Sequence, residues 1–175
     1  VAAMTAESAQ TKALQPAAFA GFTAKNIGGL TDGSTTTAAI PVISAEQAAY
    51  LSADAIKGLA STQVDGATTT AFTSDAFAAI QPNSLKAMST ATFKAVQATT
   101  AFKGITPEQV KALTLDQFAA MTTAQIPQLD ADDASVFTAA QLVKWTAAQA
   151  TTLTTAAIAA IPVDAVSKIV ISNFD

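Results

Sequence analysis

The sequence predicts a mainly α-helical repeat protein, a solenoid of short helices built from an eight-residue unit, or octad. Three observations predict this fold: apolar residues recur at every eighth position, a helix-capping pattern recurs in the same register, and prolines and charged residues keep fixed places within the unit. A chain of 175 residues is long enough for one domain, so we expect a single repeat domain over 1–175. The octads are interrupted over 1–104 and regular over 105–175.

Two apolar positions define the octad in the second half of the chain. The first core position recurs at Ile105, Leu113, Met121, Leu129, Phe137, Trp145, Leu153, Ile161 and Ile169. The second core position follows five residues later, at Val110, Phe118, Ile126, Ala134, Leu142, Ala150, Ile158, Val166 and Phe174. One long helix is excluded, because this stripe would turn by about 80° with every octad and leave any fixed core. We therefore expect helices of about two turns, each too short to be stable alone.

A helix-capping pattern follows each first core position. Threonine or aspartate comes next, and glutamine or aspartate stands three residues later, as in Thr106 with Gln109 and Asp130 with Asp133. In such a capping box the first side chain accepts a hydrogen bond from the first turn, and the second reaches back to the N–H of the cap. Proline favours the first helical position, which is occupied by Pro16, Pro82 and Pro107. Each octad is therefore expected to start a new helix.

The first half of the chain keeps the octad but interrupts it with two similar segments. Asp-Gly-Ser-Thr-Thr-Thr-Ala at 32–38 recurs 33 residues later as Asp-Gly-Ala-Thr-Thr-Thr-Ala at 65–71. Asp-Gly favours a turn, and three β-branched residues in a row favour extended chain. If one superhelical turn takes about 33 residues, or about four octads, the two tracts would form a short Thr ladder. Its members would be Thr35, Thr36, Thr37, Thr68, Thr69 and Thr70. Two similar surface loops are the alternative.

The two ends of the repeat array lack the polar residues of capping repeats. The chain begins in mid-octad, and the segment 168–174 loses the threonine cap and gains β-branched residues. This segment is predicted to be a strand with an unpaired edge or a degenerate last octad. Because uncapped solenoid ends tend to associate, we expect self-assembly, as a head-to-tail homopolymer or against flanking repeats. The candidate assembly residues are Val1, Met4, Ile169, Ile171, Phe174 and, as an aromatic residue outside both core positions, Tyr50.

Composition excludes several functional classes. The chain has no histidine and no cysteine, so the usual general base, thiol nucleophiles, disulfides and thiolate metal sites are missing. The acidic cluster at 130–133 lacks the glycine and the distal glutamate of an EF-hand loop, and is expected to start a helix. We expect no enzyme, no cofactor and no metal. A net charge of −4 disfavours nucleic acid as a partner, and no apolar run has the length of a transmembrane segment.

The unit Leu-Thr-x-x-Gln-Ile-x-x, rich in alanine and threonine and low in charge, resembles the repetitive regions of very large secreted or surface-attached microbial proteins. The resemblance is clearest from Ile105 to Val166. It implies an extracellular or cell-surface location and a structural or adhesive role, and it carries no site residues. We therefore expect a noncatalytic subunit or segment of an extracellular filament, surface layer or adhesive fibre that assembles end to end. The alternatives are an adhesin module that binds surface glycan and an ice-binding protein, because a flat Thr array resembles several ice-binding surfaces.

Overall fold

The computed structural model describes residues 15–27, 44–59 and 72–167. Within these ranges the chain is mainly helical, as the sequence predicts, with α-helices and 3-10 helices (η) of three to six residues. In chain order the elements are η1 (Pro16–Gly21), α2 (Ala45–Ala48), α3 (Ala53–Lys57), α5 (Ser74–Ala79), α6 (Pro82–Leu85), α7 (Thr90–Ala95), η3 (Phe102–Gly104), α8 (Pro107–Ala112), α9 (Leu115–Ala120), η4 (Ile126–Gln128), α10 (Ala131–Ala134), α11 (Ala139–Leu142), α12 (Ala147–Ala150), α13 (Thr155–Ala160) and α14 (Val163–Ser167).

The predicted helix starts are confirmed over the regular half of the chain. The N-caps of α8 to α13 recur in the register of the octad, at Thr106, Thr114, Asp130, Thr138, Thr146 and Thr154. Thr122 and Gln125 make the same pair of capping hydrogen bonds just before η4. Full capping boxes form at α8, α9, α10, α11 and α12. Local capping chemistry therefore places a helix start in every octad of this part.

The helices are shorter than the two turns that the sequence pattern suggested. The regular α-helices have four to six residues, which is less than two turns of 3.6 residues. The reason is visible at the corner between α8 and α9, where Leu113 has ψ 139° and Thr114 has ψ 157°. The first core position and the cap are thus both extended, and at most six of the eight residues remain for the helix.

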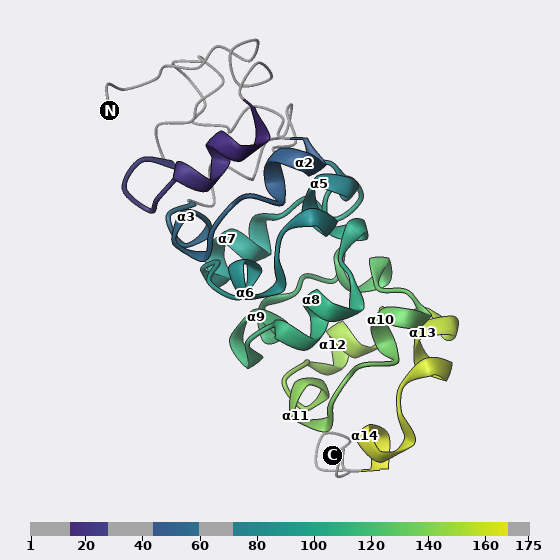
Figure 1. Ribbon diagram of the computed structural model, residues 1–175. Coiled ribbons are helices and arrows are strands. Elements are labelled where there is room, and N and C mark those ends of the chain that lie inside the picture. Colours follow the sequence, from purple (N-terminus) through teal and green to yellow (C-terminus); the bar gives the residue numbers. More distant parts are fainter. Residues whose placement is uncertain (1–14, 28–43, 60–71, 168–175) are drawn as a thin grey trace.

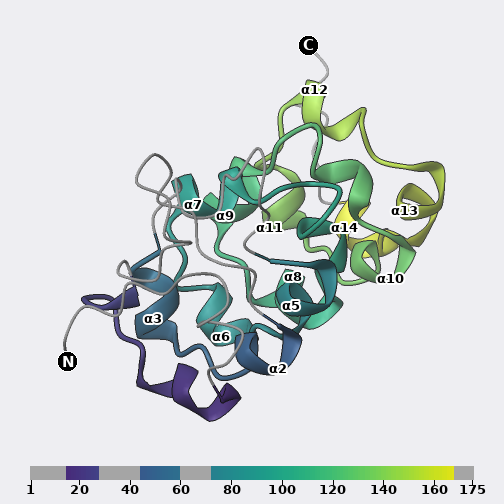
Figure 2. The same ribbon diagram turned by 90° about the horizontal axis from the view of Figure 1, so that it is seen from above.

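The described helices other than η4 and α12 stack in three rows, of which the first ends at η3. One row contains η1, α2, α5 and η3, a second contains α3, α6, α8, α10 and α13, and a third contains α7, α9, α11 and α14. From α5 onward each helix of a row contacts the third helix further along the chain. In Figure 1 the second and third rows lie side by side from teal to yellow, and Figure 2 shows the same progression from a direction 90° away. Helix contacts in this part therefore recur every three octads and not at the distance of about four octads considered for the Thr ladder.

We use the term level for the helices of three successive octads, on which the helices of the next three octads stack. Glutamines at the third helical position join one level to the level before it. In α9, Gln117 Oε1 accepts from the N–H of Thr114 at 3.0 Å, and its Nε2 donates to the carbonyl oxygens of Leu85 at 3.1 Å and Met88 at 2.8 Å. The same double role belongs to Gln109, Gln125, Gln141 and Gln149. The Nε2 bonds span 28 to 32 residues, because the amide reaches the corner that precedes the stacked helix. The hydrogen bonds therefore join residues nearly four octads apart, although the helices that stack on one another are three octads apart.

The core is one continuous apolar cluster to which helices of all three rows contribute. Both core positions of the octad point into it: Leu129 is 1% exposed, and Val110, Phe118 and Ile126 are fully buried. Where an element must approach its neighbour closely, the chain has glycine. A Cβ on Gly104 would overlap the backbone carbonyl of Ser74 in the adjacent element of its row. In the described ranges no helix combines the length and the apolar character needed to cross a membrane.

Candidate functional site

The last three described helices, α12, α13 and α14, expose core positions that are buried in earlier helices. Ile158 in α13 is 54% exposed and Val166 in α14 is 48% exposed, whereas the equivalent Val110 and Phe118 are 0% exposed. Ala150 in α12 is also exposed. These three residues occupy the second core position in the last three described helices, and none of those helices has a later described helix stacked on it. The apolar stripe therefore reaches the surface at this end.

The exposed core positions form an apolar hollow of about 510 Å³, which we name the carboxy-terminal face. Its lining consists of Leu142, Trp145, Thr146, Ala147, Ala150, Thr151, Leu153, Ile158, Ile161 and Val166. None of these side chains carries a charge. A surface of this composition can gain free energy by burying apolar groups. Its two hydroxyl groups donate within the chain, Thr146 to Gln149 Oε1 at 3.0 Å and Thr151 to the carbonyl oxygen of Ala148 at 3.1 Å.

Trp145, which lines the carboxy-terminal face, packs against two further aromatic rings. Trp145 lies nearly parallel to Phe118, with ring centroids 4.5 Å apart, and meets Phe137 edge-on. Its indole Nε1 donates to the carbonyl oxygen of Phe118 at 2.9 Å. The indole is 5% exposed, so the prediction that Trp145 is a core residue is confirmed. It is also the only tryptophan in the chain and reports directly on this face.

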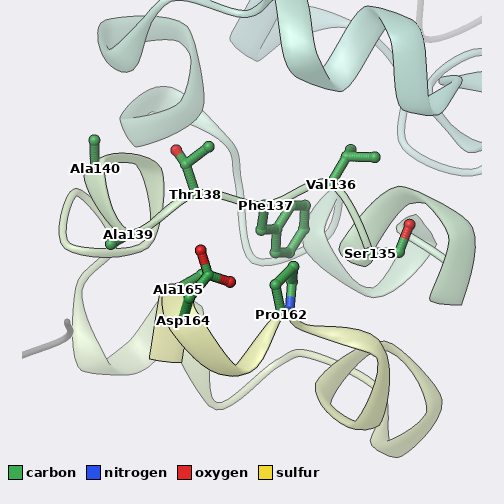
Figure 3. A pocket seen from close by; sticks show the side chains of 9 residues that line it. All are labelled: Ser135, Val136, Phe137, Thr138, Ala139, Ala140, Pro162, Asp164 and Ala165. Atoms are coloured by element: carbon green, nitrogen blue, oxygen red, sulfur yellow. The ribbon is translucent and has the colours of Figure 1, made fainter. Parts of the chain in front are cut away.

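A second hollow, of about 540 Å³, lies between the α10–α11 corner and α14 (Figure 3). The carboxylate of Asp164 points into it, and Ser135 and Thr138 supply hydroxyl groups to its lining. Both hydroxyls already donate hydrogen bonds, Ser135 to the carbonyl oxygen of Asp132 at 2.6 Å and Thr138 to Gln141 Oε1 at 3.0 Å. One carboxylate without a partner base or a second acid does not make a catalytic pair.

Acidic residues gather at the start of α10, but they serve the helix. Asp130 caps α10 and accepts from the N–H of Asp133 at 2.9 Å, while Asp133 accepts from the N–H of Asp130 at 3.2 Å. The expectation that this cluster starts a helix is thus confirmed. Within the described ranges, no three acidic side chains approach closely enough to hold a metal ion.

The structure reaches only one of the candidate residues chosen from the sequence. Tyr50 lies at the surface just after α2 and is 49% exposed. The other assembly candidates, Val1, Met4, Ile169, Ile171 and Phe174, lie outside the described residues, as do Thr35, Thr36, Thr37, Thr68, Thr69 and Thr70. Ile158 and Val166 were missed, because the periodicity assigned them to the core. Only their place in the last described turn distinguishes them from buried equivalents.

Comparison with protein-family models, with curated proteins and with solved structures found no match for this chain. The class of protein is therefore inferred from its own fold and from the carboxy-terminal face.

Proposed function

We propose that this chain is a noncatalytic structural protein, a solenoid with three octads per turn whose copies associate end to end through the carboxy-terminal face. One observation carries the proposal. The residues of the last described turn that face the end of the stack, Ile158 and Val166, are about half exposed although the same octad position is fully buried in earlier turns.

The solenoid is supported by contacts that repeat along the chain. Helices contact the third helix further on, from α5 with η3 to α11 with α14. Glutamine side chains join successive levels with hydrogen bonds that recur from Gln109 to Gln149. Helices of four to six residues are not stable alone, so each level depends on its neighbours. A stack of this kind ends in an apolar surface unless a different structure covers it.

A second copy of the chain is the occupant that fits the carboxy-terminal face best. In the interior, another level of the same octads covers each set of core positions, and every copy carries such levels. The lining has no charge that would oppose contact between identical chains. Burying a side chain such as Ile158 contributes roughly 1 to 2 kcal/mol, so several of them together can sustain association. An end-to-end contact that does not close on itself produces a filament.

The setting we propose is an extracellular filament, surface layer or adhesive fibre. Two features support it. The octads resemble repeats of large secreted or surface-attached microbial proteins, and only 13% of the residues are charged, which gives weak electrostatic protection against self-association.

The test replaces an exposed core residue with a charged one and measures association. Ile158→Asp puts a carboxylate on the carboxy-terminal face, whereas Val163→Asp puts it on a residue that is 84% exposed and outside that face. Light scattering coupled to size-exclusion chromatography, with electron microscopy at high concentration, gives the mass and shape of the assemblies. We expect concentration-dependent assemblies for the wild type and for Val163→Asp, and at least a tenfold higher association threshold for Ile158→Asp.

A wild type that stays monomeric over the whole concentration range would overturn the end-to-end proposal. The octad register assigns Ile169 and Phe174 to the two core positions that follow α14, so the chain's own residues are a competing occupant. Phe174→Asp separates these occupants. If Ile169 and Phe174 covered the face, the wild type would be monomeric. The Phe174→Asp variant would then associate more readily than the wild type, and its Trp145 fluorescence would be quenched more strongly by an added soluble quencher.

A further inference from the structure

Asp133 stands at the position where other octads carry the glutamine that links two levels of helices. In the preceding octad, Gln125 Nε2 donates to the carbonyl oxygens of Phe93 at 3.1 Å and Val96 at 2.9 Å. In the following octad, Gln141 Nε2 donates to the carbonyl oxygen of Val110 at 3.1 Å. Asp133 keeps the capping half of this role, because its Oδ2 accepts from the N–H of Asp130. A carboxylate has no N–H for the other half.

The second carboxyl oxygen of Asp133 is buried without a hydrogen-bond partner. Asp133 is 3% exposed, and its Oδ1 is the one such oxygen among the described side chains. Carbonyl oxygens of the preceding level receive the amide donor in the neighbouring octads, and for Asp133 the same register assigns Phe102 and Ile105. An ionised oxygen left unpaired in the interior is costly. A proton on Oδ1 would remove the charge and supply the missing donor.

The charged groups around Asp133 also favour the protonated form. The pKa of Asp133 is raised from 3.8 to about 6: burial is the largest cause, the carboxylates of Asp130, Asp132 and Glu108 add to the rise, and the hydrogen bond from the backbone of Asp130 opposes it. α8 and α13 pack against α10. α8 carries Glu108 and, in its last turn, Lys111, and α13 has no charged residue. We find no cation among the groups that act on Asp133.

We propose that Asp133 is a proton-controlled replacement for the linking glutamine, so that α10 is held to the preceding level of helices in mild acid and loses this hold when Asp133 ionises. The inference rests on the stacking of the helices and is independent of whether copies associate. It makes one level of the stack weaker at neutral pH than its neighbours, which have amide links.

The sign of the pH dependence follows from the raised pKa of Asp133. The folded state keeps the proton up to about pH 6, whereas an unfolded chain releases it near 3.8. The stabilisation is therefore complete below pH 3.8, decreases as the pH rises and is gone above about pH 6. A pKa difference of about two units corresponds to roughly a 100-fold change in the unfolding equilibrium constant.

The test compares unfolding of three variants with that of the wild type between pH 4 and pH 8, at low protein concentration. Asp133→Gln restores an amide of the length found in the other octads, and Asp133→Asn removes the charge without adding length. Asp132→Asn is the matched control, because Asp132 is next in sequence but exposed. The quantity of interest is the ratio of unfolding constants, wild type over variant, because effects common to both proteins cancel in it. Carboxyl NMR of Asp133 gives its midpoint directly.

We expect the ratio for Asp133→Asn to rise about 50-fold between pH 4 and pH 7 and then level, because the unfolded chain has already lost part of its proton at pH 4, and the ratio for Asp132→Asn to stay nearly constant. Asp133→Gln should follow Asp133→Asn and add stability at all pH values if its amide reaches the carbonyl oxygens. Ratios that stay constant with pH for both Asp133 variants, or an NMR midpoint below pH 4.5, would overturn the proposal.

Discussion

At the scale of single residues, the close packing of successive levels depends on positions that cannot hold a side chain. Gly104 in η3 and Gly58 at the end of α3 both lie directly against the backbone of a residue from an adjacent level, Ser74 and Ala24 respectively. Neither position would look special in the octad pattern. A glycine here is required by the neighbouring backbone and not by local conformation.

Gly104→Ala is expected to destabilise the protein by about 3 kcal/mol, because the added Cβ would overlap the carbonyl of Ser74 and backbone cannot move aside as a side chain can. Gly21→Ala is the matched control, since a Cβ at Gly21 meets nothing within 4 Å. Chemical denaturation monitored by circular dichroism measures both. Equal stability of the two variants would contradict the close approach.

At the scale of the helical element, the glutamine side chain at the third helical position has two roles. It helps to start its own helix, and it links that helix to another level. The threonine cap and the Oε1 of glutamine organise the first turn locally, and the Nε2 of the same glutamine satisfies carbonyl groups at a corner of the preceding level. Because such short helices gain little from their own hydrogen bonds, this second interaction adds stability that the element needs. Asp133 shows what happens when the second half of the device is missing: an oxygen remains buried without a partner.

Gln117→Ala should cost about 2 to 4 kcal/mol, since it removes one cap acceptor and leaves the carbonyl groups of Leu85 and Met88 without this donor in a buried place. Gln81→Ala offers a control with the same change of side chain: Gln81 is exposed at the N-cap of α6 and makes no capping hydrogen bond. Its effect should stay within about 0.5 kcal/mol. Thermal and urea unfolding provide the comparison, and similar losses for both variants would argue against the double role of the glutamine.

At the scale of the whole molecule, tertiary contacts have a limited range along the chain. The hydrogen bonds between levels join residues 27 to 33 apart, and each helix contacts its row neighbours. The core is continuous, yet the first and last levels share no row contact. Cooperativity should therefore pass from level to level, as in other stacked repeats, and weaken with distance.

Gly58→Ala should lower protection from hydrogen exchange in α3 and α6, which contact one another, and leave α11 and α13 nearly unchanged. Hydrogen exchange followed by mass spectrometry resolves these segments at neutral pH. A protein with one indivisible core would instead lose protection to the same extent in all of them. That outcome would contradict stacking with interactions only between neighbouring levels.

Much of this architecture could be predicted from local sequence, because caps, first-turn prolines and core periodicity act within one octad. Thr106, Thr114 and Thr138 start helices where the pattern places them, and Phe118 and Trp145 are buried as expected. The length of the helices was overestimated, since the pattern alone does not reveal that two residues at each corner are extended.

The rest depends on residues one level away and was decided only by the tertiary structure. The octad does not specify whether three or four units make a repeat distance, because both spacings keep the apolar positions facing inward. It also cannot distinguish Ile158 from Val110, whose local patterns match and whose exposures of 54% and 0% depend on whether another level covers them. The raised pKa of Asp133 has the same origin: burial by stacked helices, and not its capping motif, disfavours the charge.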